Sequence, residues 1–79
     1  EVYTNQPGVQ LYTGNWLKGS AVGKLNTQYD QFHGFCLETQ KYPDSVHQPH
    51  FPTVILRPNE TYEHVMVHRF SAHAVKSRL

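Results

Sequence analysis

The chain has 79 residues, which is enough for one small domain at most, and such a domain buries roughly 60–65% of its unfolded surface. Hydrophobic residues make up 38% and charged residues 16% of the chain, which is typical of a folded protein and excludes a disordered one. The net charge is +1, from seven basic and six acidic residues that are scattered along the chain. They form no basic stripe, so nucleic-acid binding is not predicted. No apolar run is long enough to span a membrane.

A single cysteine excludes an internal disulfide and a cysteine-based zinc site. It favours a reducing compartment, and the first residues lack the pattern of a signal peptide. The sequence therefore predicts a cytoplasmic protein with no membrane partner.

Short strands separated by turns are predicted for the first third of the chain. Glu1–Thr4 is β-prone and is stopped by Asn5–Gly8, a turn built on Pro-Gly. Val9–Thr13 alternates, with Val9, Leu11 and Thr13 on one face and Gln10 and Tyr12 on the other. Trp16–His33 has little periodicity and predicts a long loop, and loops of that length in compact domains tend to be functional.

Gly34–Gln40 is predicted to be a strand that carries a carboxylate. Alternation places Glu38 on the face of Cys36, opposite to Phe35 and Leu37. An acid on an otherwise apolar strand is paired, partly desolvated or positioned for chemistry. Spacing alone favours the simplest interpretation, an exposed acid on the polar face of a half-buried strand.

The second half continues the pattern of strands and irregular segments. Lys41–Pro52 contains three prolines, which exclude a regular helix and a central strand. Thr53–Leu56 predicts a β-branched strand, and Arg57–Glu60 predicts a turn in which Asn59 can adopt the left-handed conformation. Tyr62–Phe70 has the clearest period of two in the chain. No segment shows helical periodicity over ten residues.

These segments predict an all-β fold with long loops. Five short strands form a poor core by themselves, and open strand edges favour association. We therefore expect the chain to be the C-terminal part of a larger antiparallel β-protein, whose partner is the remainder of the same domain, N-terminal to Glu1.

Six histidines suggest a metal-site hypothesis, but their spacing favours surface or packing roles. His47 and His50 share a Pro-rich loop without a second pair of ligands. His64 and His68 would share a strand face about 13 Å apart, too far for one metal. His33, next to the Gly34–Gln40 strand, is a better candidate for proximity to a site, although a plain loop role is favoured. No metal is predicted.

The last three residues, Ser77-Arg78-Leu79, are a variant of the Ser-Lys-Leu address that the peroxisomal import receptor reads. Two interpretations stay open for the tail of residues 74–79. It is either a frayed end of a cytoplasmic protein or a microbody-targeting signal.

Several motifs occur in order: NQPGVQ at 5–10, YTGN at 12–15, GFCLETQ at 34–40, PDS at 43–45 and the segment from Phe51 to Tyr62 with its RPxETY pattern. Together they resemble the C-terminal part of the aldose 1-epimerase (galactose mutarotase) family. The resemblance covers residues 1–73, which would form the C-terminal segment of an incomplete domain.

The resemblance implies a large galactose mutarotase-like β-supersandwich. It also implies cofactor-independent interconversion of the α and β anomers of free aldoses such as galactose or glucose. The Glu of the LETQ motif is the family's general base, which is Glu38 here, and the Gln that ends QPGVQ contributes to sugar binding, which is Gln10 here. The family's acid is a histidine upstream of this segment, so the isolated chain is expected to be inactive.

Some positions depart from the family pattern. Trp16 stands where Phe is frequent and could stack on a sugar, although packing is favoured for so large an aromatic residue.

Two other functions stay open. One is a non-catalytic carbohydrate-binding or structural relative, and the other is a hexose-phosphate epimerase paralogue, which would need a basic cluster for the phosphate.

Overall fold

The computed structural model describes residues 1–75. The Ser77-Arg78-Leu79 tripeptide lies outside the described residues. In chain order the elements are β1 (Val2–Thr4), β2 (Gly8–Tyr12), β3 (Ala21–Val22), the 3₁₀ turn η1 (Lys24–Asn26), β4 (Gln28–Tyr29), β5 (Cys36–Gln40), the 3₁₀ turn η2 (Ser45–His47) and β6 (Met66–His68). The prediction of an all-β fold is confirmed.

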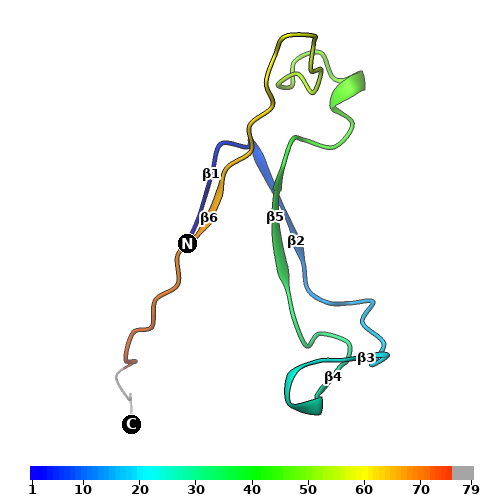
Figure 1. Ribbon diagram of the computed structural model, residues 1–79, viewed down its shortest axis with the longest axis vertical. Coiled ribbons are helices and arrows are strands. Elements are labelled where there is room, and N and C mark those ends of the chain that lie inside the picture. Colours follow the sequence, from blue (N-terminus) through cyan, green and yellow to red (C-terminus); the bar gives the residue numbers. More distant parts are fainter. Residues whose placement is uncertain (76–79) are drawn as a thin grey trace.

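The strands form three separate antiparallel ribbons, β1–β6, β2–β5 and β3–β4. Figure 1 shows β1–β6 and β2–β5 as two arms that diverge from the turn between β1 and β2, with β3 and β4 beyond the far end of β2–β5. The β2–β5 ribbon is the longest, and five residues pair on each strand. The ribbons do not close into a sandwich within residues 1–75.

A close backbone approach explains where the β2–β5 ribbon ends. Gly14 follows β2 with φ of +73°, and a Cβ atom there would lie 2.7 Å from the carbonyl oxygen of Gly34. No side chain fits at that distance, and the left-handed φ also favours glycine. The glycine of the YTGN motif therefore lets the chain leave β2 directly beside the chain that enters β5.

Two predicted strands differ in the structure. Thr53–Leu56 is not a strand, because β propensity needs a hydrogen-bonded neighbour and none pairs with this segment within the described residues. The predicted strand Tyr62–Phe70 is reduced to β6, because only Met66–His68 have β1 opposite them.

The predicted loop Trp16–His33 was wrong in part, because its centre forms the β3–η1–β4 hairpin. Its strands are only two residues long, too short for a periodic pattern in the sequence. The predicted turn Arg57–Glu60 is confirmed. The Glu60 amide donates to the Arg57 carbonyl at 3.1 Å, and Asn59 has φ of +68°.

The described residues do not enclose a hydrophobic core. Among residues 1–75 no hydrophobic side chain is buried, and the buried polar side chains are Gln6 and Thr39. The radius of gyration is 18.3 Å, whereas a compact chain of this length has about 12 Å. An open cleft of about 600 Å³ separates the two arms, lined by residues that include Val2, Leu37 and Phe70. Backbone hydrogen bonds therefore hold the two strands of each ribbon together, while the apolar side chains on the ribbon faces stay exposed to solvent.

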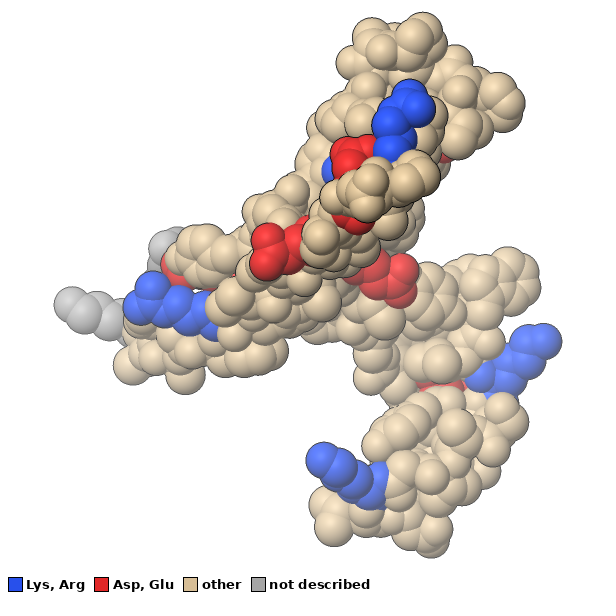
Figure 2. Space-filling view, turned by 45° about the horizontal axis from the view of Figure 1, so that its top comes forward, with Lys and Arg blue, Asp and Glu red and all other residues tan. Residues whose placement is uncertain are grey.

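Charged side chains are dispersed over this open shape. Figure 2 shows the Lys and Arg side chains at separate places on the visible face, with acidic side chains between them. Within residues 1–75, no helix has the length and apolar character that crossing a membrane requires.

Candidate active site

The two site residues predicted from the sequence lie directly opposite each other in the β2–β5 ribbon. The register pairs Gln10 with Glu38, and the next outward pair on the same side of the ribbon is Tyr12 with Cys36. Directly opposed residues of an antiparallel pair have Cβ atoms about 4.5–5.5 Å apart and share a face. The amide of Gln10 and the carboxylate of Glu38 are therefore neighbours, although 28 positions separate them in the chain.

The face that carries this pair, called the site face below, consists of the alternate ribbon positions Gly8, Gln10, Tyr12, Cys36, Glu38 and Gln40. Gln10 and Glu38 are exposed. The Gln10 amide donates only a long hydrogen bond of 3.4 Å to the Leu11 carbonyl. The ion pairs within residues 1–75 join other groups, so the Glu38 carboxylate is free of them. A proton acceptor and an amide thus stand side by side on an open surface.

The opposite face of the ribbon is tied to the segment before β6. Thr39 is 6% exposed, and its hydroxyl shares a 2.8 Å hydrogen bond with Nε2 of His64. Nδ1 of His64 lies 3.2 Å from the hydroxyl of Tyr62. Because Thr39 is adjacent to Glu38 in β5, this contact fixes the strand that carries the carboxylate.

Asn5 ties the start of β2 to the same segment. Its side-chain amide donates to the Glu63 carbonyl at 3.0 Å, and its oxygen accepts from the Val65 amide at 3.0 Å. A side chain that both donates to and accepts from one extended segment acts as an extra rung of the sheet. We call Asn5, Thr39 and His64 the junction, because together they join the two arms.

An aromatic ring closes one end of the site face. A Cβ atom at Gly8 would lie 3.1 Å from two ring carbons of Tyr42, a tighter contact than most Cβ atoms make, so glycine gives the ring its room. The ring of Phe51 meets Tyr42 edge-on, with 5.1 Å between centroids. The Ser45 hydroxyl donates a hydrogen bond to the Tyr42 carbonyl.

Asp44 organises the loop that follows Tyr42. It has φ of +61°, and its carboxylate accepts hydrogen bonds from the Gln48 amide at 2.9 Å and pairs with the His47 ring at 2.6 Å. The hydrogen bond from Gln48, and then the one from His47, lowers the pKa of the Asp44 carboxyl below its usual value. These two contacts tie Asp44 to His47 at the end of η2 and to Gln48 directly after it.

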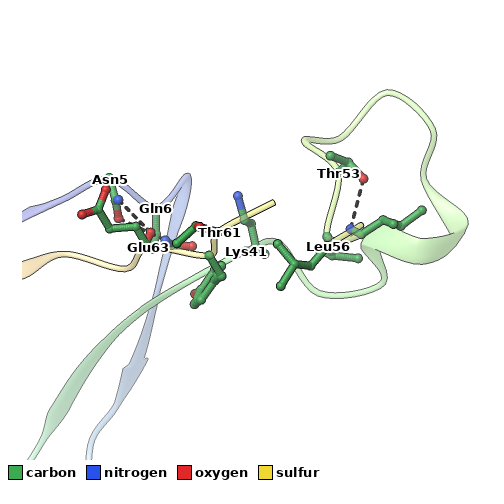
Figure 3. Close-up of a pocket in the computed structure, with 10 residues that line it drawn as sticks. Asn5, Gln6, Lys41, Thr53, Leu56, Thr61 and Glu63 are labelled. Carbon is green, nitrogen blue, oxygen red and sulfur yellow. Dashed lines mark hydrogen bonds between the residues drawn. The ribbon is translucent and has the colours of Figure 1, made fainter. Parts of the chain in front are cut away.

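A second cleft, with both polar and apolar residues in its lining, lies beside Asn5 of the junction. The cleft has a volume of about 400 Å³. Figure 3 shows it between the Asn5–Gln6 turn, Lys41 and the 53–63 segment, with Asn5 and Glu63 joined by their hydrogen bond. Gln6 lines it, and its buried Oε1 has no hydrogen-bond partner among the described residues. Neither Gln10 nor Glu38 lines this cleft.

Other residues considered from the sequence lie outside the Gln10–Glu38 pair. His33 turns back on Asp30, whose amide donates to its Nδ1 at 3.1 Å. The Trp16 side chain is 74% exposed, and its backbone amide donates to the Tyr12 hydroxyl at 2.9 Å. Within residues 1–75 no group of three or more His, Cys, Asp or Glu side chains could hold a metal.

Alternation placed Tyr12 on the face of Gln10 and Cys36 on the face of Glu38, but sequence reasoning did not pair the two strands and did not place Tyr42 beside the predicted pair. No signal in the sequence places Tyr42 over Gly8, because that contact depends on how the loop after β5 folds back.

Comparison of the sequence with known proteins identifies the family of the chain. Residues 1–69 match the family model described as "Aldose 1-epimerase". The chain belongs to the aldose 1-epimerase family.

Among its relatives, the chain is 58% identical over 71 residues to the galactose mutarotases of Bos taurus and Homo sapiens. These matches cover 90% of this chain and 21% of each relative. It is also 35% identical over 74 residues to the aldose 1-epimerase of Escherichia coli, with 91% of this chain and 21% of that protein covered. The chain thus spans about a fifth of the length of the curated relatives it matches.

Proposed function

We propose that this chain is part of an aldose 1-epimerase that interconverts the α and β anomers of free aldohexoses, with Glu38 as the general base and Gln10 as a sugar-binding residue. The observation that carries the proposal is the direct pairing of Gln10 with Glu38 on one exposed ribbon face. Membership of the family and identity to galactose mutarotases support the choice of substrate.

The proposed reaction needs one base and one acid. Glu38 removes the proton from the anomeric hydroxyl while an acid protonates the ring oxygen, and the bond between the anomeric carbon and the ring oxygen breaks. The aldehyde group then rotates, and the hydroxyl that contains the former ring oxygen adds to the other face of its carbonyl carbon. Glu38 returns its proton to the carbonyl oxygen, and the adding hydroxyl returns its proton to the acid. The atoms balance without a cofactor. A positioned base contributes about 10²–10⁴-fold to such a step.

Gln10 complements Glu38 in this scheme. A carboxamide both donates and accepts hydrogen bonds, which suits a sugar hydroxyl, and its long bond to the Leu11 carbonyl is easily exchanged for a ligand. The acid and the remaining sugar contacts come from the rest of the domain, so the substrate lies between the site face and that part.

The test is polarimetry of freshly dissolved α-galactose and α-glucose with the complete domain that contains this chain. Glu38→Gln keeps the shape of the side chain but removes its basicity, so we expect kcat to fall by about 10²–10⁴-fold. Gln10→Ala is expected to raise KM. Glu63→Gln changes a carboxylate in the segment before β6 and serves as the matched control, with activity unchanged.

Full activity of Glu38→Gln would remove Glu38 from the role of base. Normal activity of the isolated 79 residues would refute the division of the site between this chain and the rest of the domain. A complete domain that binds galactose without turnover would favour the alternative of a non-catalytic carbohydrate-binding relative.

The cellular compartment is a separate proposal. We propose a cytoplasmic protein, with microbody import through Ser77-Arg78-Leu79 as the alternative. Residues 74–79 fused to a fluorescent reporter decide between them, because a diffuse signal excludes the import signal.

A further inference from the structure

Tyr42 lies at one end of the site face. Its ring covers Gly8, which pairs with Gln40 and lies two residues along the ribbon from the Gln10–Glu38 pair. At about 3.3–3.4 Å per residue, the two positions are about 7 Å apart. That spacing is about the width of one pyranose ring.

We propose that Tyr42 is a sugar-binding residue, whose ring forms an aromatic wall for the aldose held at Gln10 and Glu38. The proposal rests on the proposed function of the same site. A pyranose has apolar C–H groups on its faces and hydroxyls around its edge. The hydroxyls meet Gln10 and Glu38, and a C–H surface packs against the tyrosine ring, whose apolar body and polar tip suit such a ligand.

The position of the ring is built by several independent contacts. Phe51 meets it edge-on at 5.1 Å, the Ser45 hydroxyl holds the Tyr42 carbonyl, and the absent side chain at Gly8 leaves the space. Asp44 then stabilises the loop through Gln48. A ring that is fixed before the ligand arrives loses little conformational entropy on binding.

Part of the Tyr42 ring stays open, since Phe51 meets it at one edge and Gly8 lies beneath it, and the residue is 38% exposed. The remaining surface belongs to the same side of the ribbon as the carboxylate, because Gly8 and Gln10 point to one face. An aromatic surface of this kind is available to a ligand on the site face.

The experiment compares Tyr42→Leu and Tyr42→Phe in the complete domain. Tyr42→Leu keeps an apolar side chain over Gly8 but removes the flat ring, so we expect KM to rise about tenfold with kcat within about twofold, as for lost uniform binding. Tyr42→Phe keeps the ring and is expected to change KM by less than about twofold. An unchanged KM in Tyr42→Leu, or a loss of kcat at unchanged KM, would overturn the proposal.

A second substitution reaches the same ring from the other strand. The methyl group of Gly8→Ala would meet the Tyr42 ring at 3.1 Å, so the ring must shift by a few tenths of an ångström and KM should rise in the same direction. Tyr3→Leu is the matched control, because Tyr3 is an exposed tyrosine in β1, outside the site face. If Tyr3→Leu raised KM as much as Tyr42→Leu does, the rise would be a general effect on folding, and the proposal would be overturned.

Binding of galactose, measured by saturation-transfer NMR with and without Tyr42→Leu in a Glu38→Gln background, separates this inference from the proposed function. Weaker galactose binding caused by Tyr42→Leu, together with no mutarotation by the domain that retains Glu38, supports the aromatic wall and contradicts the proposed reaction. Unaltered binding in Tyr42→Leu, together with a large loss of kcat in Glu38→Gln, supports the reaction and overturns the wall.

Discussion

At the scale of single residues, the loop after β5 depends on one exposed carboxylate. Asp44 accepts hydrogen bonds from Gln48 and His47 while it holds a left-handed backbone conformation. These bonds favour the charged form, so the pKa of the Asp44 carboxyl is lower in the folded chain than in the unfolded one. Because this loop holds Tyr42 in place, the Asp44 carboxylate acts indirectly on the end of the site face where Tyr42 lies.

The first prediction concerns the pKa of Asp44. Because its folded pKa is lowered, its stabilising contribution is complete above the usual value of about 3.9 and is lost as the pH falls through the folded pKa. Gln48→Ala removes the larger cause, so the pKa of Asp44 should rise towards its usual value in a ¹³C NMR titration. Gln28→Ala in β4 should leave it unchanged, and an unaltered pKa in Gln48→Ala would contradict this assignment.

At the scale of elements, the arrangement of the two arms depends on the junction. Asn5 bonds Glu63 and Val65, and Thr39 bonds His64, so three consecutive residues before β6 are tied to β5 and to the turn before β2. The site pair depends in turn on the register between β2 and β5. Two predictions test these two features.

Asn5→Ala should lower the free energy of unfolding of the complete domain by about 1–3 kcal/mol, because it leaves the Glu63 carbonyl and the Val65 amide without their partner. Asn5→Asp keeps the acceptor for Val65 and should cost less. Hydrogen exchange distinguishes the variants: the Val65 amide should lose protection in Asn5→Ala and retain it in Asn5→Asp. Equal exchange in both would exclude this bond as a stabilising contact.

The register can be tested with one new cysteine. Tyr12 pairs with Cys36, and directly opposed antiparallel residues have Cα atoms about 4.5–5.5 Å apart, which a disulfide can span. Tyr12→Cys should therefore form a disulfide with Cys36 under mild oxidation, detected as the loss of both free thiols by alkylation and peptide mass mapping. Leu11→Cys, on the opposite face, should not. A disulfide in Leu11→Cys would mean that the strands are shifted and that Gln10 does not face Glu38.

At the scale of the whole molecule, the described residues expose most of what a sandwich would bury. Large apolar side chains such as Phe35, Phe70 and Ile55 are 59–88% exposed. Hydrophobic burial is the main favourable term in folding. The ribbons of the isolated chain therefore lack the contacts that would make their unfolding cooperative.

We predict that the isolated 79 residues show no cooperative thermal transition and bind a hydrophobic dye. The complete domain should melt cooperatively and bind little dye, because its other strands cover the apolar faces. Circular dichroism melting and dye fluorescence measure both properties. A stable monomer with a cooperative transition, with nothing else bound, would refute this prediction.

The positions of the strongest strands followed from local pattern. Alternation in Val9–Thr13 and Gly34–Gln40 predicted β2 and β5 within two residues at each end, and the left-handed tolerance of asparagine predicted the turn at Asn59. Thr53–Leu56 shows the limit of this reasoning. Its β-branched residues fit a strand, but a strand exists only where another chain segment offers hydrogen bonds.

The sequence by itself determined the family of this protein, its β-rich character and the two residues proposed for the site, because motifs and alternation are local properties of the chain. Only the tertiary structure decided that Gln10 and Glu38 stand opposite each other, that Asn5 and His64 connect the arms, and that Tyr42 covers Gly8. Each of these is a contact between segments distant in the chain. Such contacts depend on the register in which two strands pair and on the path by which a loop returns to the sheet. No single segment of the sequence encodes either of them.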